Sequence, residues 1–421
     1  MPEMTPPSVS RRGVLLAGLA GASISAIPSL ATGALPTVKP LWSHRAYEAF
    51  GVCSHPNFGK SVYKYTDAWL SAFAQTGAYF FRGGYDEGLT ATSVTVRGAR
   101  SRGLKWGMEI CEGLSMPDSH IVARIKHIAA NAADVCLYVE GINEPNYVRG
   151  GGAVPSDWRQ RTVAKQRLIW QTVKGDSRLS RVKVLGPSLQ AVKATEGDYN
   201  ILGDLGLAQY IDYAAIHRYP GGHYPNVLLD TNVSWVKRHL SGRPVWITET
   251  GYTNCLANTS GHKPVPEDVA AVYAPSALLE AVDRGCKTTW YELLDDVDAG
   301  GKDVIESNFG MFATMSGMAP PWRAKPVVGA MRSFLSLLKD SGPTYDPPAL
   351  GLSITSQASD VRRTVTGRRD GSVTVHLRRA TDCWNTSTQR RISVAQVPVV
   401  LTTSRGSRTV LVDHRVRSVR L

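Results

Sequence analysis

The sequence lacks the clustered cysteines and histidines that define zinc-binding and disulfide-rich proteins. Six cysteines are scattered over 421 residues, and none stands in a Cys-x-x-Cys motif or at a metal-ligand spacing from a histidine. Structural zinc sites need such spacing, so we expect no metal, and no motif points to a cofactor. The pairing of the cysteines stays open; they are Cys53, Cys111, Cys136, Cys255, Cys286 and Cys383.

Long hydrophobic runs are also scarce, and none after residue 34 is long and apolar enough to span a bilayer. Within the first 34 residues, Ser10-Arg11-Arg12-Gly13 is followed by an apolar, small-residue stretch at 14–27. Residues 29–31 then offer a small-x-small cleavage site. This order is typical of a twin-arginine export signal. We therefore expect residues 1–34 to be a signal peptide and the protein to be secreted or periplasmic; an uncleaved, membrane-tethered form is the alternative.

Lysine and glutamate are absent from residues 351–421, which carry thirteen arginines and four aspartates and therefore most of the net charge of +13. Such a basic tail favours association with an anionic envelope or polysaccharide, with a solvated surface as the plainer alternative. Trp384 is the one aromatic residue interleaved with these arginines, so nucleic-acid binding is not expected. We expect a monomer.

What the sequence does contain is a regular alternation of β-like and helix-like stretches between residues 42 and 343. Eight strands each followed by a helix in this length predict a (β/α)8 TIM barrel, which we place at 35–343. An open doubly wound sheet would need a glycine-rich first turn, and residues 53–57 contain no glycine. The expected strands are 50–53, 78–82, 104–110, 135–141, 182–185, 213–217, 245–248 and 288–293, and the expected helices 66–75, 94–102, 118–133, 157–176, 198–209, 232–241, 266–284 and 325–339.

After residue 343 the pattern changes to short alternating runs. Residues 361–367 and 373–379 flank Asp370-Gly371, and 397–403 and 409–413 flank Arg405-Gly406, which predicts two hairpins. We therefore expect an Arg-rich, β-sandwich-like antiparallel domain at 344–421, completed by residues just before the barrel.

Two segments deliver a glutamate at the end of an apolar run. They are Gly141-Ile142-Asn143-Glu144-Pro145-Asn146 and Val245-Trp246-Ile247-Thr248-Glu249-Thr250-Gly251. The two glutamates are 105 positions apart in the sequence. In a barrel, chemistry occurs at the carboxyl ends of the strands, and these are the fourth and seventh strands. Two carboxylates facing each other across a cleft are what glycosidic bond cleavage needs. Capping or salt-bridging carboxylates are the structural alternative.

These segments resemble the signature of clan A of the glycoside hydrolases, retaining (β/α)8 enzymes with catalytic glutamates on strands four and seven. The resemblance spans residues 42–339. Within the clan, Gly141 to Asn146 and the appended β domain are most similar to family 39 and related bacterial exopolysaccharide-cleaving glycosidases. The strand-eight segment 290–296 departs from that pattern.

The resemblance implies a double displacement with Glu144 as general acid/base and Glu249 as nucleophile, and with Asn143 hydrogen-bonded to the sugar 2-hydroxyl. Retention requires carboxyl groups about 5 to 5.5 Å apart, against about 6.5 to 9.5 Å for inversion, and we expect the shorter distance. A non-catalytic glycan-binding barrel and a metal-dependent barrel phosphodiesterase are the alternatives. The second would need several His, Asp or Glu ligands on adjacent strand ends.

Five further residues are candidates for binding substrate or holding Glu249. By the resemblance, Arg82, His217 and Tyr219 would lie beside Glu249, and Trp290 would form the floor of the sugar site. His55 ends the first strand, where its side chain can reach sugar hydroxyls. Each has a structural alternative: an ion pair for Arg82, satisfied core groups for His217 and Tyr219, core packing for Trp290 and a loop turn for His55.

Overall fold

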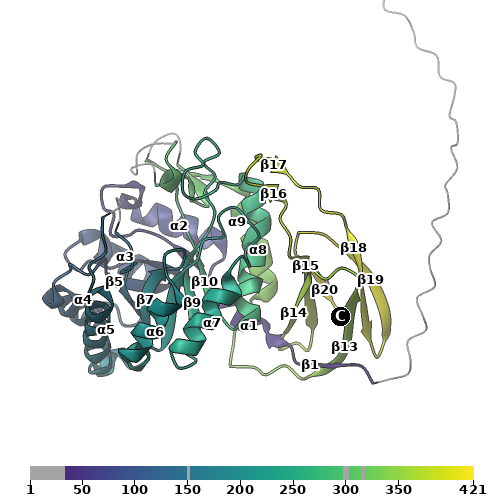
Figure 1. The fold of residues 1–421 in the computed structure, drawn as a ribbon, viewed down its shortest axis with the longest axis horizontal. Helices are drawn as coiled ribbons and strands as arrows, with labels where there is room; N and C mark the ends of the chain where they lie inside the picture. Colours follow the sequence, from purple (N-terminus) through teal and green to yellow (C-terminus); the bar gives the residue numbers. More distant parts are fainter. Residues whose placement is uncertain (1–33, 149–151, 297–302, 315–317) are drawn as a thin grey trace, which may run out of the picture.

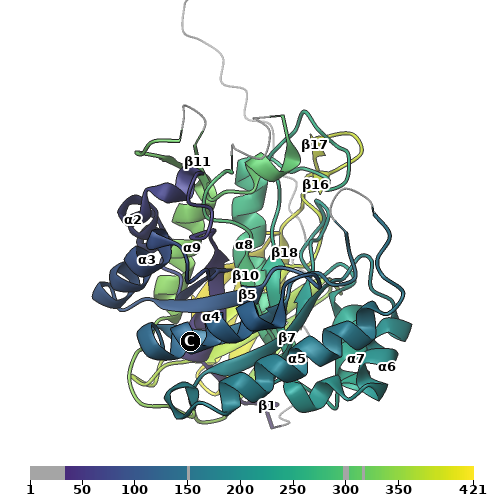
Figure 2. The same cartoon turned by 90° about the vertical axis from the view of Figure 1, so that its left-hand side faces the viewer.

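The computed structural model describes residues 34–148, 152–296, 303–314 and 318–421. Eight parallel strands close into a barrel in the order β10-β3-β4-β5-β6-β7-β8-β9, which confirms the predicted (β/α)8 fold. Figures 1 and 2 show the helices around the outside of this barrel. The strands are β3 (Phe50–Cys53), β4 (Phe80–Gly84), β5 (Lys105–Cys111), β6 (Cys136–Ile142), β7 (Lys183–Gln190), β8 (Tyr213–His217), β9 (Val245–Thr250) and β10 (Lys287–Trp290).

The helices follow the predicted positions with shifted ends. The stretch expected as one helix at 198–209 is divided at Gly206, whose φ of 81° interrupts the helix and begins a short 3-10 turn, Leu207–Tyr210. The helices are α1 (Ser43–Tyr47), α2 (Thr66–Thr76), α3 (Thr90–Ser101), α4 (Asp118–Asn131), α5 (Trp158–Lys174), α6 (Glu196–Asp204), α7 (Leu229–His239), α8 (Glu267–Asp283) and α9 (Pro326–Leu338). None of the described helices is long and apolar enough to cross a membrane.

The interior of the barrel is filled in layers. Phe80, Tyr138 and Trp246 pack together with Leu185 and Ala215 in one buried cluster, and the ring centroids of Tyr138 and Trp246 lie 4.6 Å apart. Gly107 makes room for this layer, because a Cβ there would lie 2.1 Å from the Tyr138 ring. Above the aromatic layer, towards the carboxyl ends of the strands, the inward residues become charged: Arg82 follows Phe80 by two positions, and Glu140 follows Tyr138 by two. The aromatic layer thus forms a rigid, dry floor under a polar site.

Beyond the barrel, two four-stranded sheets enclose a second hydrophobic core. The two predicted hairpins are confirmed as β14 (Val361–Gly367) with β15 (Val373–Arg379), and β18 (Val397–Thr403) with β19 (Gly406–Val412). β13 (Leu350–Ser356) and β20 (Arg417–Arg420) extend these sheets. Two short strands from before the barrel, β1 (Thr37–Val38) and β2 (Leu41–Trp42), pair with β13 and β14, so residues 37–42 complete the β domain.

The β domain packs against helices α8 and α9, which lie between it and the barrel (Figure 1). A buried ion pair fixes this arrangement: the Arg378 guanidinium donates to Glu280 over 2.8 Å and to Asp283 over 2.8 Å. All six cysteines are buried, and Cys53, Cys111, Cys136, Cys286 and Cys383 are free thiols. The predicted domain boundaries stay predictions, and the predicted signal segment lies outside the described residues except for residue 34.

Candidate active site

Glu144 lies just past the end of β6, in a backbone conformation that ordinary side chains rarely adopt. Its φ is 41°, and its N–H donates to the carbonyl of Ser188 over 2.9 Å. The preceding residue, Asn143, is held to the carbonyl of Cys111 over 2.9 Å. Left-handed non-glycine residues cost free energy and concentrate at functional sites. Strands on both sides therefore fix the direction in which the Glu144 side chain leaves the barrel.

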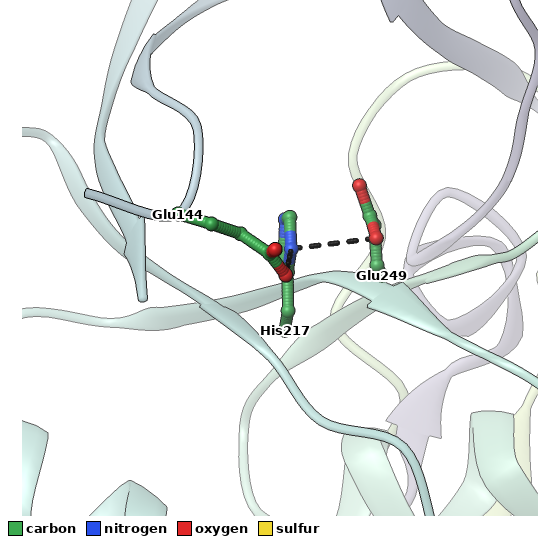
Figure 3. Close-up of side chains that lie close together, drawn as sticks. All are labelled: Glu144, His217 and Glu249. Carbon is green, nitrogen blue, oxygen red and sulfur yellow. Dashed lines mark hydrogen bonds and ion pairs between the residues drawn. The ribbon is translucent and has the colours of Figure 1, made fainter. Parts of the chain in front are cut away.

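Glu144 and Glu249 face each other across one histidine (Figure 3). Glu249 is the penultimate residue of β9, and His217 ends β8. The Nδ1 atom of His217 lies 2.8 Å from Glu144 Oε1 and 3.3 Å from Glu249 Oε2. One carboxylate oxygen of each glutamate and a ring nitrogen of His217 all lie within 4.8 Å of one another. The two carboxylates therefore reach the same small region at the carboxyl ends of the strands.

Arg82 lies under both glutamates and connects the site to the barrel interior. Its side chain is 2% exposed. Nη1 donates to Glu249 Oε1 over 2.7 Å, and Nη2 donates to Asn143 Oδ1 over 3.1 Å. The predicted strand ended at Arg82, but β4 continues two residues further, to Gly84. Arg82 therefore lies within the strand, and the neighbouring strands enclose its guanidinium. One fixed cation therefore orients residues from two different strand ends.

Tyr219 completes the surroundings of Glu249 by donating its hydroxyl proton to Oε2 over 2.7 Å. Burial acts to raise the pKa of Glu249, but the charges of His217 and Arg82 and the Tyr219 hydrogen bond outweigh burial. The pKa of Glu249 therefore lies below its ordinary value, and the carboxylate form is favoured at neutral pH.

In its neutral form, His217 carries the ring proton on Nδ1, the nitrogen that faces the two glutamates. Its Nε2 lies 3.4 Å from Arg82 Nη2, which can only donate, so Nε2 accepts and Nδ1 bears the hydrogen. Burial acts to lower the pKa of His217, but the carboxylates of Glu249 and Glu144 outweigh burial and raise it. His217 is thus a proton-bearing bridge between two acids.

Two further glutamates, a fully buried one on β6 and a partly buried one on β5, also surround Arg82. Glu140 accepts from Nε over 2.5 Å and from Nη2 over 3.2 Å, and Glu109 Oε2 lies 3.4 Å from Nη2. Burial raises the pKa of Glu109 to about 7, against the opposing effect of Arg82. The positive charge of Arg82 is therefore shared among several carboxylates, and one of them, Glu109, is half protonated near neutral pH.

The mouth above the glutamates is lined by aromatic rings. Tyr219, Tyr291 and Phe309 pack edge to face, with ring centroids 5.3 to 6.0 Å apart. His262, from the loop after β9, lies against Tyr219 at 4.7 Å, and burial lowers its pKa. The sequence pattern marked the loops at 147–158 and 252–266 as long, but gave no signal that His262 or Phe309 would reach the site.

His55 lies against Tyr291, with ring centroids 5.7 Å apart, and it is held by Glu292. Its Nε2 is 2.9 Å from Glu292 Oε2, and its ring stacks on Phe58 at 4.6 Å. Glu292 is fully buried, and burial together with neighbouring acidic groups raises its pKa well above the ordinary value. Burial also lowers the pKa of His55. The pair therefore favours a neutral imidazole beside a protonated carboxyl.

Trp290 does not form the floor of the sugar site, as the sequence resemblance implied. It is 1% exposed and packs in the main hydrophobic core, with its ring 5.7 Å from that of Tyr252. No ring face is open for a sugar to stack on. The next residue, Tyr291, is the first after β10 and packs among the aromatic rings of the mouth instead.

Glu144, His217 and Glu249 also satisfy the geometry of a three-ligand metal site. Their existing contacts fit a metal poorly. Both oxygens of Glu249 already accept hydrogen bonds, from Arg82 and Tyr219, and a guanidinium cation lies 2.7 Å from one of them. A divalent ion would have to displace one of these donors and share the site with a buried positive charge.

The fold of this chain is similar to that of several solved structures, whereas its sequence has no close match. No protein-family model matches the sequence, and no curated protein matches it. Among solved structures, a family 39 glycoside hydrolase from the gut symbiont Bacteroides cellulosilyticus WH2 superposes with a TM-score of 0.59 at 14% identity, covering 90% of this chain and 81% of that one. A family 1 β-glucosidase from Thermotoga maritima gives 0.52 at 10% identity, covering 72% and 98%. A β-glucosidase from Exiguobacterium marinum gives 0.51 at 11% identity, covering 71% and 99%. The chain therefore has the (β/α)8 barrel fold of these glycoside hydrolases.

Proposed function

We propose that this protein is a retaining glycosidase that hydrolyses O-glycosidic bonds of a poly- or oligosaccharide by double displacement. The observation that carries the proposal is the pair of carboxylates at the ends of the fourth and seventh barrel strands, within 4.8 Å of each other on either side of His217. The likeness of the fold to glycoside hydrolases supports the same chemistry.

Glu249 is the nucleophile in this mechanism. Arg82 and Tyr219 hold one oxygen each and keep the carboxylate ionised. One oxygen attacks the anomeric carbon, the C–O bond to Glu249 forms, and the bond to the leaving oxygen breaks. The developing positive charge on the sugar ring is stabilised by the negative charge of Glu249 itself.

Glu144 is the general acid/base. Among the described residues, its carboxyl has hydrogen-bonding partners in His217 at 2.8 Å and Gln190 at 3.5 Å, so it is less constrained than Glu249 and can reach the leaving oxygen. It donates a proton to that oxygen in the first step. In the second step it takes a proton from water, whose oxygen attacks the anomeric carbon and releases Glu249.

Asn143 is placed to bind the sugar. Its Oδ1 accepts from Arg82, which orients the amide. Within the described residues no partner takes up Nδ2, so its hydrogens can bond to a substrate hydroxyl. Tyr291 and His55, whose rings pack edge to face with centroids 5.7 Å apart, are the candidates for contacts with the rest of the sugar.

The test is a hydrolysis screen over poly- and oligosaccharides with wild type and Glu249→Gln. We expect the variant to lose turnover on every substrate that the wild type cleaves, while Glu112→Gln, at a rim glutamate that is 56% exposed, keeps it. A Glu249→Gln protein that still turns over would refute the assignment. Proton NMR of the first-formed anomer distinguishes retention from inversion.

A metal-dependent hydrolase is the second candidate, because Glu144, His217 and Glu249 cluster at ligand distance. Elemental analysis of the purified protein and assays with and without a chelator separate the two candidates. Activity that a chelator removes and a divalent cation restores would favour the metal mechanism. A protein that binds oligosaccharides without cleaving any of them would be the glycan-binding barrel.

Export and assembly form part of the same proposal. We propose a secreted or periplasmic monomer, exported with a twin-arginine signal at residues 1–34, and an anionic envelope or polysaccharide as partner of the basic β domain. Mass spectrometry of the exported protein locates the cleavage site. Cytoplasmic retention should follow from Arg11→Lys combined with Arg12→Lys, and light scattering should give the monomer mass.

A further inference from the structure

A groove separate from the barrel mouth runs between the two domains. It has a volume of about 1090 Å³ and lies between helices α8 and α9 on one side and strands β19 and β20 on the other. Figure 1 shows these two helices beside the sheets of the β domain. The groove shares no residue with the site around Glu144 and Glu249.

Three arginines line this groove and carry an unbalanced charge. Arg408 comes from β19, Arg417 from β20 and Arg415 from the segment between them, and all three are exposed. In the part of the chain that the structure describes, none of the three side chains takes part in an ion pair or hydrogen bond, and no aspartate or glutamate lines the groove. Elsewhere in the same domain, Arg378 and Arg379 are paired with acids.

The rest of the lining combines hydroxyl groups with aliphatic surface. Ser333 and Thr409 offer exposed hydroxyls, whereas the hydroxyls of Ser336 and Ser418 bond to the Ser333 carbonyl and to His376. Leu337 and Leu411 are 50% and 56% exposed. A guanidinium binds a carboxylate with two parallel hydrogen bonds, hydroxyls exchange hydrogen bonds with sugar hydroxyls, and aliphatic groups cover the C–H faces of a sugar ring. The lining therefore matches a chain of acidic sugars.

The same features argue against other polyanions. Phe334 is the one aromatic residue in the lining and is 5% exposed, so no ring is available for nucleic-acid bases to stack on. The arginines line a concave groove, whereas a lipid surface meets a flat or protruding face.

We propose that this groove binds a segment of a polyanionic polysaccharide that carries uronate carboxylates, and so holds the enzyme on its polymer while the barrel acts elsewhere on it. The choice of a saccharide rests on the proposed function, whereas the binding itself does not. Because the contacts are charged and exposed, they weaken as salt rises.

The experiment measures binding of oligogalacturonate by isothermal titration to the full chain carrying Glu249→Gln, which prevents turnover. The groove variant combines Arg408→Gln, Arg415→Gln and Arg417→Gln. The matched control combines Arg363→Gln, Arg390→Gln and Arg405→Gln, three exposed arginines of the same domain that do not line the groove. Cello-oligosaccharide of equal length, phosphatidylglycerol vesicles and a single-stranded oligonucleotide are the competing probes.

We expect oligogalacturonate to bind, the groove variant to raise Kd roughly tenfold and the control to change it less than about twofold. Cello-oligosaccharide should not bind at the groove. The proposal is overturned if oligogalacturonate does not bind, if both triple variants weaken binding equally, or if vesicles or the oligonucleotide bind more tightly through the groove arginines. Unchanged thermal unfolding midpoints verify that both triple variants are folded. Because turnover is not measured, failure here is distinct from failure of the glycosidase assignment.

Discussion

Arg82 donates from Nη1 to Oε1 of Glu249 over 2.7 Å, from a side chain that is 2% exposed. The same guanidinium holds Glu140 with two further hydrogen bonds. The Glu249 carboxylate is therefore fixed by a cation that is itself fixed inside the barrel, where it is almost completely buried. Preorganised charge of this kind acts without reorganising during the reaction.

Replacing Arg82 should cost both stability and activity. Arg82→Met leaves Glu140 buried without its partner, which costs about 3 to 5 kcal/mol of unfolding free energy. Arg100→Met, which breaks an exposed pair with Asp134, should cost at most about 1 kcal/mol. Urea denaturation measures both. Adding Glu140→Gln to Arg82→Met should restore part of the stability but not the turnover; recovery of turnover would show that Arg82 has only a structural role.

Removing the Tyr219 hydroxyl should change the pH profile. This hydrogen bond favours the charged form of Glu249 and helps to keep its pKa below the ordinary value. In Tyr219→Phe the pKa of Glu249 rises, so the acidic limb of the kcat/KM profile moves to higher pH. Loss of a hydrogen bond to a charged group should also lower kcat/KM at neutral pH by roughly 10- to 150-fold. An unmoved acidic limb would contradict this role.

Glu144→Gln should affect substrates according to their leaving groups. Proton donation contributes about 10²- to 10⁴-fold where the leaving oxygen is basic, as in a natural glycan, and little where it is an activated phenol. Cleavage of the glycan should therefore fall far more than cleavage of the nitrophenyl glycoside of the same sugar. Glu249→Gln is the control, because it should abolish both reactions. Equal losses in Glu144→Gln would refute its role as the acid.

The barrel was predictable because its strands are short β-forming runs that stop at polar, Pro or Gly residues. The runs ending near Asn143 and Glu249 therefore also marked the site. Glu140 and Glu109 were not predictable as neighbours of Arg82. They lie within buried strands, and parallel strands are covered on both faces, so periodicity does not tell which residues point inward.

The order of Trp290 and Tyr291 illustrates the same limit. Moving by one residue reverses the direction of a strand side chain, and register is set by pairing with β3 and β9 rather than by local sequence. Trp290 was therefore assigned to the sugar and belongs to the core. His262 and Phe309 approach the mouth from loops whose course depends on tertiary packing, which sequence pattern does not determine.

Glu109 should make stability fall as the pH rises from about 4.5 to about 7. Its pKa is about 7 in the folded protein, above the ordinary value of 4.5, so the folded state binds more protons than the unfolded state in this window. The stabilisation is complete below pH 4.5 and is lost as the pH rises through 7, with an upper bound of roughly 3 kcal/mol. Glu109→Gln should flatten this part of the curve in urea denaturation, whereas Glu112→Gln should not. A variant with the same decline as wild type would show that another group titrates.

Tyr291 and Trp290 should respond to truncation in opposite ways. Tyr291 is partly exposed among the rings of the mouth, so Tyr291→Ala should raise KM for oligosaccharides with little change in unfolding free energy. Trp290 is buried in the core, so Trp290→Ala should cost about 3 to 5 kcal/mol of stability. At a temperature where both variants are folded, the KM of Trp290→Ala should stay closer to wild type than that of Tyr291→Ala. The reverse order would restore Trp290 as the sugar platform, and denaturation curves run beside the kinetics decide between the two.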